Sequence, residues 1–577
     1  MALDIINTAY YQPKYSNDKK FNIERRDALI YTVRDSETGK TELVVKPTPE
    51  YTFYRTKAFD YKYPRICISK DEVEEMKCPY YLRKSEMAKA IGKSNEYRMS
   101  KTMSWQSGQE WYDKNIVASP FLYSVDFDIE DQFKLFWSFK NPRSKIVKLK
   151  KAFADIEVDI WNFNGKLDVE IAERPINVIT YFDETSMSLH AFLLDNQPEN
   201  AKLQMIKADP YGYYDRILKK KLPDLGYKMF INFYENEARL IIDFFAQIHK
   251  DKPDFCGFWY MPFDIRYILN RLKRQLKMDP FQICCHPSVP DEFKRIDYYI
   301  DPGRDKTKIA MNKKQGIKPE SELVDWVNIA GYTQFYDMRC MYSNLRRRFK
   351  EDDYSLDTIC NKNIGEGKTP LSEYGLTIRT AAYKDYELFL EYSLTDTLRL
   401  YQLEKKLHDL DSWYTTAGVT RLSKTHNVSF IIRNRLTQTV FEPHNQVSGN
   451  NVKYDIWGKI SGAIVARQEL CYADSVEVGG KPSTIYENCI DMDASSQYPS
   501  LTEILNICKA TVYYKGLKVY TLDDKGREII LGSGDDFHQL LQTRASSIFD
   551  LCQKYFNLPS IKEMSNMFKR ENEIGKT

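Results

Sequence analysis

The chain has 577 residues, more than a single hydrophobic core supports, so we expect about three domains. Its 84 basic and 81 acidic residues nearly balance, which excludes binding to nucleic acid through bulk charge alone but not through a local basic patch. With no apolar run long enough for a bilayer, no targeting signal, and eleven cysteines that lack the spacing of a zinc site, we expect a cytoplasmic protein with reduced thiols and no membrane partner.

The first 149 residues predict a mixed, β-rich domain. Strand-like runs occupy 28–33, 41–45 and 51–56, and a turn joins the first two. From residue 172 onward, strand-like runs alternate with helical ones, which predicts an α/β domain. The clearest helix covers 235–250, where apolar side chains recur at helical spacing.

The later part of the chain continues this mixture. Residues 287–327 are richer in Lys, Asp, Gly and Pro and predict a surface insertion such as a hairpin. Residues 379–410 predict helix, 455–520 predict strands, and the last part predicts a helical tail. The fold class that follows is multidomain, α/β and α+β.

Residues 151–160, KAFADIEVDI, place two carboxylates one residue apart in an apolar strand. Side chains alternate between the faces of a strand, so Ala154 and Ile156 share one buried face. Asp155 and Glu157 share the other face, where like charges repel unless a cation lies between them. The pattern predicts either the solvated face of an edge strand or a site for divalent metal ions.

Two further carboxylates are candidates to complete such a site. Asp264 lies at the start of a helical stretch in 257–275, where capping of that helix is the alternative role. Asp396 lies one helical turn after Tyr392 within 391–407, and an ordinary pair on a helix surface is the alternative there. Two divalent cations about 4 Å apart need several carboxylates, and a tyrosine beside the last acid can hold the attacking water. Acids from one strand, a middle helix and a late helix suit a ribonuclease-H-like sheet.

The segments ADIEVD, GFWYMPFDIRYI and YSLTD resemble, in order and spacing, the three exonuclease motifs of family-B DNA polymerases. The last segment has the YxxxD form of the DEDDy subclass. The resemblance implies a 3′→5′ proofreading exonuclease that uses two Mg²⁺ or Mn²⁺ ions per active site. It implies metal ligands at Asp155, Glu157, Asp264 and Asp396, with Tyr392 orienting the water.

The same resemblance implies that Trp259 and Phe263 contact single-stranded DNA. The family usually has an asparagine five residues before the middle aspartate, and Trp259 stands there instead, so we expect a different grip on the strand, such as stacking. Residues 336–360 resemble the segment before the third motif in bacteriophage polymerases of the T-even type. The arginine run at 346–348 either contacts phosphate or forms a solvated helix face. A viral source would place the protein in the host-cell cytoplasm.

A second site is half present in the string DASSQYPS, which resembles polymerase motif A. The resemblance implies that Asp493 binds both catalytic ions of the polymerase site. It implies that Ser496 and the backbone amides around Gln497 contact the phosphates of a dNTP. Tyr498 would lie beneath the incoming sugar.

Upstream of this string, Gly479 and Gly480 match the two glycines of the family's YxGG element, which lets the backbone approach primer–template DNA. Glu477 stands where the family has tyrosine, and Lys481 is expected to add a phosphate contact. Motifs B and C are missing, although nucleotide transfer needs carboxylates from both motif A and motif C. We therefore expect polymerase activity only with a second polypeptide that carries motifs B and C; a truncation would give the same sequence. A sliding clamp is a further candidate partner.

Two tripeptides imitate the end of a phosphate-binding loop. The GKT at 367–369 lacks the loop's first glycine, because Lys362 occupies that position. The GKT at 575–577 fails in the same way at Arg570. We expect neither to hold a nucleotide.

The expected domain organisation has five segments: an N-terminal domain at 1–149, a 3′→5′ exonuclease domain at 150–408, a return to the N-terminal domain or linker at 409–465, a partial palm with motif A at 466–520, and the start of the fingers at 521–577. Three functions are compatible with it. The first is the N-terminal portion of a family-B DNA-directed DNA polymerase with proofreading, and the second is a stand-alone 3′→5′ exonuclease of repair or processing. The third is a non-catalytic nucleic-acid-binding subunit, against which the complete set of exonuclease residues argues.

Overall fold

The computed structural model describes residues 3–11, 27–57, 69–141, 148–163, 165, 167–301, 319–323, 325–347, 351–417, 436–450, 476–478, 481–483, 519–522 and 528–532. The chain divides into two units, Met1–Phe59 with Ile68–Ile460 and Asp60–Cys67 with Ser461–Thr577. In the second unit the described residues form two antiparallel strand pairs, β15 (Val476–Val478) with β16 (Lys481–Ser483) and β17 (Val519–Leu522) with β18 (Glu528–Gly532). Most of the predicted strand-rich region at 455–520, and the predicted helical tail, lie outside the described residues.

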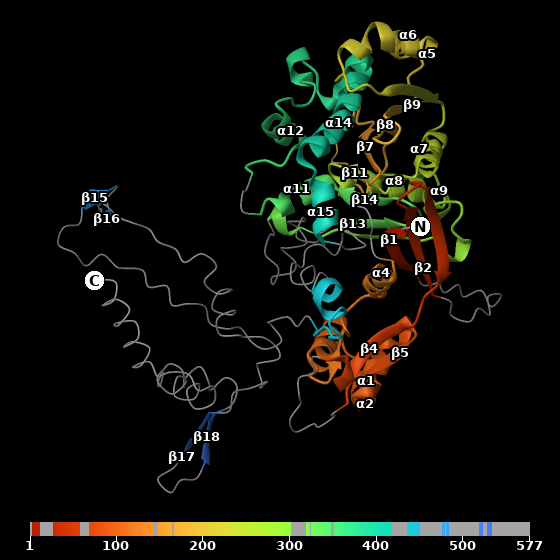
Figure 1. Ribbon diagram of the computed structural model, residues 1–577. Helices are drawn as coiled ribbons and strands as arrows, with labels where there is room; N and C mark the ends of the chain where they lie inside the picture. Colours follow the sequence, from red (N-terminus) through yellow and green to blue (C-terminus); the bar gives the residue numbers. More distant parts are fainter. Residues whose placement is uncertain are drawn as a thin grey trace, which may run out of the picture. The chain divides into compact units, whose positions relative to one another are not determined.

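The N-terminal part of the first unit contains two small antiparallel sheets (Figure 1). One consists of β1 (Leu3–Tyr11), β2 (Ala28–Asp35) and β3 (Thr41–Pro47), and the other of β4 (Tyr51–Thr56), β5 (Val73–Cys78) and β6 (Leu122–Tyr123). The α-helices described beside them are α1 (Arg83–Ala90), α2 (Ser94–Ser100), α3 (Trp105–Tyr112) and α4 (Ile129–Lys140). The three strands predicted between residues 28 and 56 are therefore confirmed.

An eight-stranded mixed sheet forms the centre of the next part, with the strand order β10-β9-β8-β7-β11-β14-β13-β12. Its strands are β7 (Lys151–Val158), β8 (Ile176–Asp183), β9 (Ser188–Leu194), β10 (Lys228–Tyr234), β11 (Phe255–Phe258), β12 (Ile296–Tyr299), β13 (Trp326–Ile329) and β14 (Gln334–Asp337). Strand β7 pairs with β8 antiparallel on one side and with β11 parallel on the other. An edge strand at 151–160, one of the two alternatives from the sequence, is therefore wrong. The predicted mixture of strands and helices is confirmed at the level of an α/β sheet.

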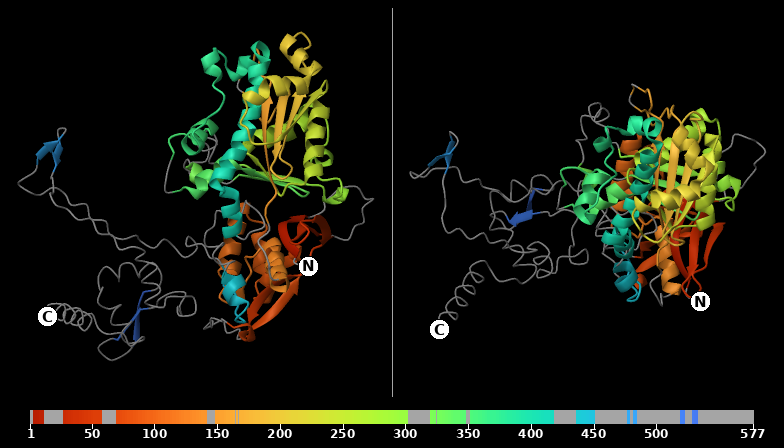
Figure 2. Two further views of the ribbon diagram at one scale, coloured as in Figure 1. Left: turned by 45° about the horizontal axis from the view of Figure 1, so that its top comes forward. Right: turned by 90° about the horizontal axis from the view of Figure 1, so that it is seen from above.

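Helices cover both faces of this sheet (Figures 1 and 2). They are α5 (Ala201–Ala208), α6 (Pro210–Arg216), α7 (Glu237–Asp251), α8 (Met261–Asn270), α9 (Pro280–Cys284), α11 (Met338–Leu345), α12 (Leu356–Ile364), α13 (Ile378–Lys384), α14 (Tyr386–Leu407) and α15 (Asp409–Ala417). Helix α14 packs across β7 and β8, whereas α7 packs on β8, β9 and β10. The predicted helix at 235–250 is confirmed as α7. The predicted helical region at 379–410 divides into α13 and α14 at Asp385, whose side chain accepts a hydrogen bond from the backbone N–H of Leu388 and so caps α14. Among the described helices, none combines the length and the apolar character that a membrane span requires.

The alternation of side chains along β7 divides them between two cores. Phe153 belongs to the apolar cluster that contains Leu398 of α14, whereas Ala154 belongs to the cluster formed with α7. Asp155 and Glu157 have the same parity as Phe153, so they point to the α14 side of the sheet. The sequence pattern thus determines which helix the two carboxylates face.

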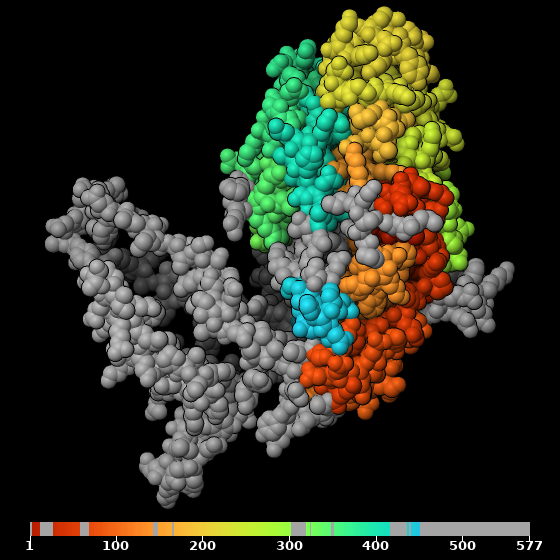
Figure 3. Space-filling model, in the orientation of Figure 1, coloured from red at the N-terminus to blue at the C-terminus, as the bar shows by residue number. Residues whose placement is uncertain are grey.

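The N-terminal part lies against the part that contains the eight-stranded sheet within the first unit, and Figure 3 shows the red surface beside the yellow-green one. Arg34 of β2 makes an ion pair of 2.5 Å with Asp254, which directly precedes β11, and both side chains are almost fully buried. Residues 436–450 also pack against the N-terminal part, where the backbone N–H of Ser124 donates to the carbonyl of Ser448 at 3.1 Å. These contacts describe the first unit; the five predicted domain limits remain predictions.

Candidate metal centre

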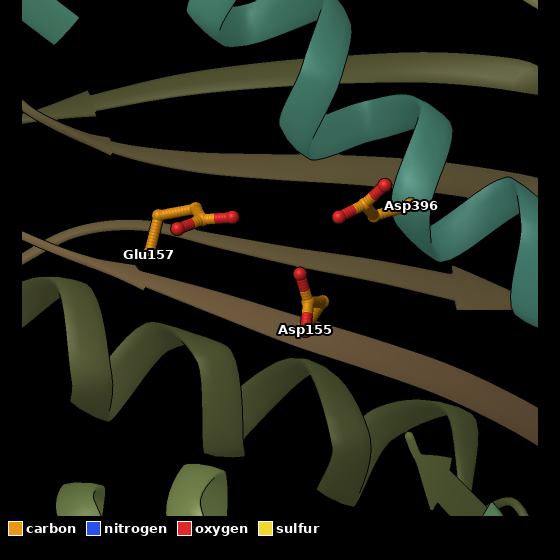
Figure 4. Close-up of side chains that lie close together, drawn as sticks. All are labelled: Asp155, Glu157 and Asp396. Atoms are coloured by element: carbon orange, nitrogen blue, oxygen red, sulfur yellow. The ribbon is translucent and has the colours of Figure 1, made fainter. Parts of the chain in front are cut away.

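Three carboxylates from two elements converge between β7 and α14. Asp155 and Glu157 project from the strand, and Asp396 projects from the helix toward them (Figure 4). One oxygen of each lies within 4.8 Å of the oxygens of the other two. Acids this close repel one another when ionised, so the arrangement is costly unless positive charge lies among them.

Contacts between α14 and the strands hold Asp396 in this place. The hydroxyl of Thr397, the next residue on the helix, lies 2.6 Å from the hydroxyl of Thr180 on β8, and both are buried. One turn further on, the ring of Tyr401 packs against that of Phe153 on β7, with centroids 6.0 Å apart. Because these contacts fix both the rotation and the position of the helix, the Asp396 side chain has little freedom to move away from the strand.

Asp264 lies beside this group but is not one of the three. It stands in the first turn of α8 and is 5% exposed. Burial, followed by the charges of neighbouring acids that include Asp155 and Glu157, raises the pKa of Asp264 well above its ordinary value. Tyr260, not Asp264, is the N-cap residue of α8, so the helix-cap alternative is wrong. Asp337, at the end of β14, is a further acid close enough to raise the pKa of Asp264.

Tyr392 and Lys368 complete the group on the α14 side. The Tyr392 hydroxyl accepts a hydrogen bond of 2.9 Å from the Lys368 ammonium, which also makes a short ion pair with Asp396. Lys368 lies on the loop after α12. Gly365 caps the C-terminal end of that helix with a φ of 77°, a conformation that favours glycine. The guanidinium of Arg399 donates to the carbonyl of Gly367 at 2.9 Å and ties this loop to α14.

The electrostatics of the site follow from burial and crowding. Burial, followed by the charge of Asp396, raises the pKa of Asp155 from 3.8 to about 7, and Lys368 opposes the rise. Burial and the charges of Asp155 and Asp396 raise the pKa of Glu157 well above its ordinary value. Burial lowers the pKa of Lys368, but Asp396, Tyr392 and Asp155 raise it by more, so the ammonium stays charged. Among the residues that the structure describes, Lys368 is thus the cation that offsets the charge of these acids.

This group of side chains fits divalent cations. Carboxylate oxygens are the ligands that Mg²⁺ and Mn²⁺ prefer. The Asp396 carboxylate has one oxygen, Oδ2, bound by Lys368, while its other oxygen, Oδ1, is buried and has no hydrogen-bond partner among the described residues. Such an orphaned acceptor is expensive to bury unless a cation or a proton satisfies it.

Sequence reasoning did not find Lys368, although it named the tripeptide that contains it. The GKT at 367–369 was excluded as a phosphate-binding loop, and the described backbone there is a short loop after a helix, with no strand before it. The lysine acts through its side chain instead. The position of Lys368 between the second and third acidic segments gave no signal, because that stretch contains many other lysines.

The two residues expected to contact the DNA strand, Trp259 and Phe263, differ in their surroundings. Trp259 is 8% exposed, and its indole N–H donates to the carbonyl of Tyr354 at 3.1 Å within the core under α14. This burial argues against base stacking on Trp259, because a stacking ring needs an open face. Phe263 is half-buried and stacks on Tyr267, with centroids 5.4 Å apart. Of the arginine run, Arg346 is bound by the Asp409 carboxylate through two hydrogen bonds, which removes it from the phosphate-contact alternative.

The residues of the predicted polymerase site lie outside the described residues. This holds for Asp493, Ser496, Gln497 and Tyr498, and for Gly479 and Gly480. Lys481 begins β16, of which only the backbone is described. Their predicted roles stay predictions.

Comparison with known proteins finds distant similarity to viral DNA polymerases. No protein-family model matches the chain. The chain is similar to the DNA polymerase of Red sea bream iridovirus, with 24% identity over 314 residues, which cover 52% of this chain and 29% of that protein. It is also similar to DNA polymerase 120R of Invertebrate iridescent virus 3, with 27% identity over 373 residues, 60% of this chain and 28% of that protein. The aligned part of the chain thus spans less than a third of the length of these relatives. They are named polymerases of iridoviruses and not of bacteriophages, so the T-even likeness stays a prediction.

Proposed function

We propose that the chain is the N-terminal portion of a family-B DNA-directed DNA polymerase and that the site between β7 and α14 is its 3′→5′ proofreading exonuclease. The observation that carries the proposal is the convergence of Asp155, Glu157 and Asp396 within 4.8 Å. Asp264 is buried beside them and Tyr392 is one turn from Asp396, in the order that the DEDDy motifs require. The distant relatives, which carry the name DNA polymerase, support the same class.

In the proposed reaction, water attacks the terminal phosphodiester of a DNA strand. The bond from phosphorus to the 3′ oxygen breaks, which releases a nucleoside 5′-monophosphate and leaves a 3′ hydroxyl on the shortened strand. Asp155, Glu157, Asp264 and Asp396 would hold two Mg²⁺ or Mn²⁺ ions, which activate water and neutralise the charge on the phosphate when bound.

Two residues of this chain act beside the carboxylates. The Tyr392 hydroxyl, with its oxygen held by Lys368, is placed to orient the attacking water. The Lys368 ammonium neutralises part of the charge of Asp396 and lowers the cost of holding the acids together. Both are on the α14 side of the site, opposite the two acids of β7.

The test is degradation of a 5′-labelled single-stranded oligonucleotide by the full chain in Mg²⁺. We expect 3′→5′ shortening by the wild type and none by Asp155→Ala with Glu157→Ala. The matched control is Glu235→Ala with Asp291→Ala, which removes two carboxylates whose side chains are 88% and 76% exposed. Unchanged degradation by the first double variant would remove the site assignment, provided that circular dichroism shows the same fold in all three proteins.

Nucleotide transfer is the second half of the proposal. It would use Asp493 together with the carboxylates of motif C, which the 577-residue sequence does not contain. We expect primer extension from dNTPs only when a polypeptide carrying motifs B and C is added. Rapid extension by the chain alone would contradict this dependence, and a stable complex that digests DNA without ever extending it would favour the stand-alone exonuclease.

A further inference from the structure

The turn between α2 and α3 exposes an unusual group of side chains. Every residue from 98 to 107 is exposed except Ser100, and we call this stretch the α2–α3 surface. Within it Trp105 is 83% exposed, Met99 is 65% exposed and Met103 is 48% exposed. Trp105 is the most exposed large apolar side chain in the part of the chain that the structure describes. Tryptophan is highly buried on average, and a cluster of large apolar side chains on a surface marks an interaction site.

The turn that displays Trp105 has well-defined contacts. Ser104 caps α3, and its side chain accepts a hydrogen bond from the backbone N–H of Ser107 at 3.3 Å. At Gly108 the two helices approach so closely that an added Cβ would lie 2.9 Å from the carbonyl oxygen of Ser100. The backbone N–H of Met103 donates to that same carbonyl at 3.3 Å. The exposed side chains therefore stand on a backbone fixed by capping and close packing.

The charged side chains of this surface are both basic. Arg98 and Lys101 make no ion pair with a carboxylate among the described residues, whereas Lys114 of the same region pairs with Glu110 at 2.9 Å. The Lys101 ammonium instead lies 4.7 Å from the centroid of the Tyr97 ring. Two exposed cations thus belong to the same surface as an exposed indole and two flexible apolar side chains.

We propose that the α2–α3 surface binds single-stranded DNA, with a base stacked on Trp105 and phosphates contacted by Arg98 and Lys101. An unpaired base offers a flat face to an aromatic ring, and a neighbouring cation neutralises its phosphate, which is the combination that sequence-independent single-strand binding uses. The bases of a duplex are already stacked on each other and offer no such face. The inference rests on the proposed function, for which it supplies a second contact with the substrate strand, away from the carboxylates.

The test uses the full chain in EDTA, where metal-dependent hydrolysis does not interfere. Fluorescence anisotropy measures its affinity for a 5′-labelled oligothymidine of about 16 nucleotides. We expect Trp105→Ala to weaken binding about tenfold or more. Arg98→Glu should weaken binding and reduce its dependence on salt, because fewer counterions are released. The matched control is Tyr211→Ala, which removes another exposed aromatic side chain, 51% exposed on α6, and should bind as the wild type does.

Three outcomes would overturn the proposal. One is equal affinity of the wild type and both variants for the single strand, with unchanged melting curves. Another is an equal loss of affinity for a duplex of the same length, which would assign the surface to backbone charge alone. The third is a change only in self-association or in binding of an added polymerase polypeptide, measured by sedimentation velocity, which would make the surface a protein interface. Since binding is measured without metal, loss of the exonuclease assignment would leave this result unaffected.

Discussion

The raised pKa of Asp155 makes the metal-free site a source of instability at neutral pH. The folded chain holds a proton on this carboxyl up to a pH of about 7, whereas the ordinary value is 3.8. Between these values the folded state binds more protons than the unfolded state, so the free energy of unfolding falls as the pH rises. Above a pH of about 7 the Asp155 carboxyl is ionised in both states, and the free energy of unfolding falls no further on its account. Asp155→Asn removes the ionisable group and keeps a side chain of nearly the same shape, so the stability of this variant should not fall with pH in this way.

The size of the stability loss follows from the rise in the pKa of Asp155. A rise from 3.8 to about 7, at about 1.4 kcal/mol per pKa unit, corresponds to at most about 4 kcal/mol. Because the Asp155 side chain keeps partial contact with water, we expect about half of this, ~2 kcal/mol, to be measured. Asp155→Asn should therefore unfold with ~2 kcal/mol more stability than the wild type at pH 8, and with nearly equal stability at pH 4.

The assay is urea denaturation of both proteins in EDTA at the two pH values, followed by the same titrations in Mg²⁺. Added Mg²⁺ should stabilise the wild type at pH 8 and should stabilise Asp155→Asn much less, because the neutral side chain is a poorer ligand. Lower stability of Asp155→Asn than of the wild type at pH 8 in EDTA, or a stability difference that does not change with pH, would refute a raised pKa of Asp155.

Three further predictions concern residues around the site. Lys368→Ala should reduce exonuclease turnover by about 10²-fold while leaving the oligonucleotide affinity nearly unchanged, and Tyr392→Phe should reduce turnover less. Single-turnover digestion measures both variants. A loss of oligonucleotide affinity with unchanged turnover would contradict the roles of Lys368 and Tyr392 in the reaction. Lys151→Ala should cost about 3–5 kcal/mol of unfolding free energy, because it strands the buried Glu404 that Lys151 contacts at 2.8 Å, and a melting experiment that finds less than 1 kcal/mol would refute this. Trp259→Ala should cost about 3–5 kcal/mol through the core and should leave the intrinsic single-strand affinity of the folded fraction unchanged.

The sequence was sufficient to predict the strand at the site, because a period of two is visible in the residues themselves. Ala154 and Ile156 had to face one core, so Asp155 and Glu157 had to face the other side. That Asp396 would meet them was predicted through the family resemblance, since no local pattern relates a helix to a strand more than 200 residues away. The structure supplies the physical reason. A hydroxyl pair joins α14 to β8, the neighbour of β7 in the sheet, and an aromatic pair one turn further on joins α14 to β7 itself.

The roles of Trp259 and Lys368 were out of reach for a different reason. An aromatic residue beside an acid can stack on a ligand or fill a core, and only the packing around it decides which. Lys368 lies in a loop, where side-chain direction depends on the glycine-ended helix before it and on the hydrogen bond from Arg399 to the loop backbone. Residue types and their spacing do not predict the packing around Trp259 or the direction of the Lys368 side chain.

The convergence of Asp155 and Asp396 has a consequence for the chain as a polymer. A cation shared by these two side chains would act as a crosslink that closes a loop of more than 200 residues. Closing so long a loop removes many conformations from the unfolded chain, so the ions that serve the reaction would also restrain the whole region between β7 and α14. Chelation would then loosen the architecture of the molecule as well as stop its chemistry.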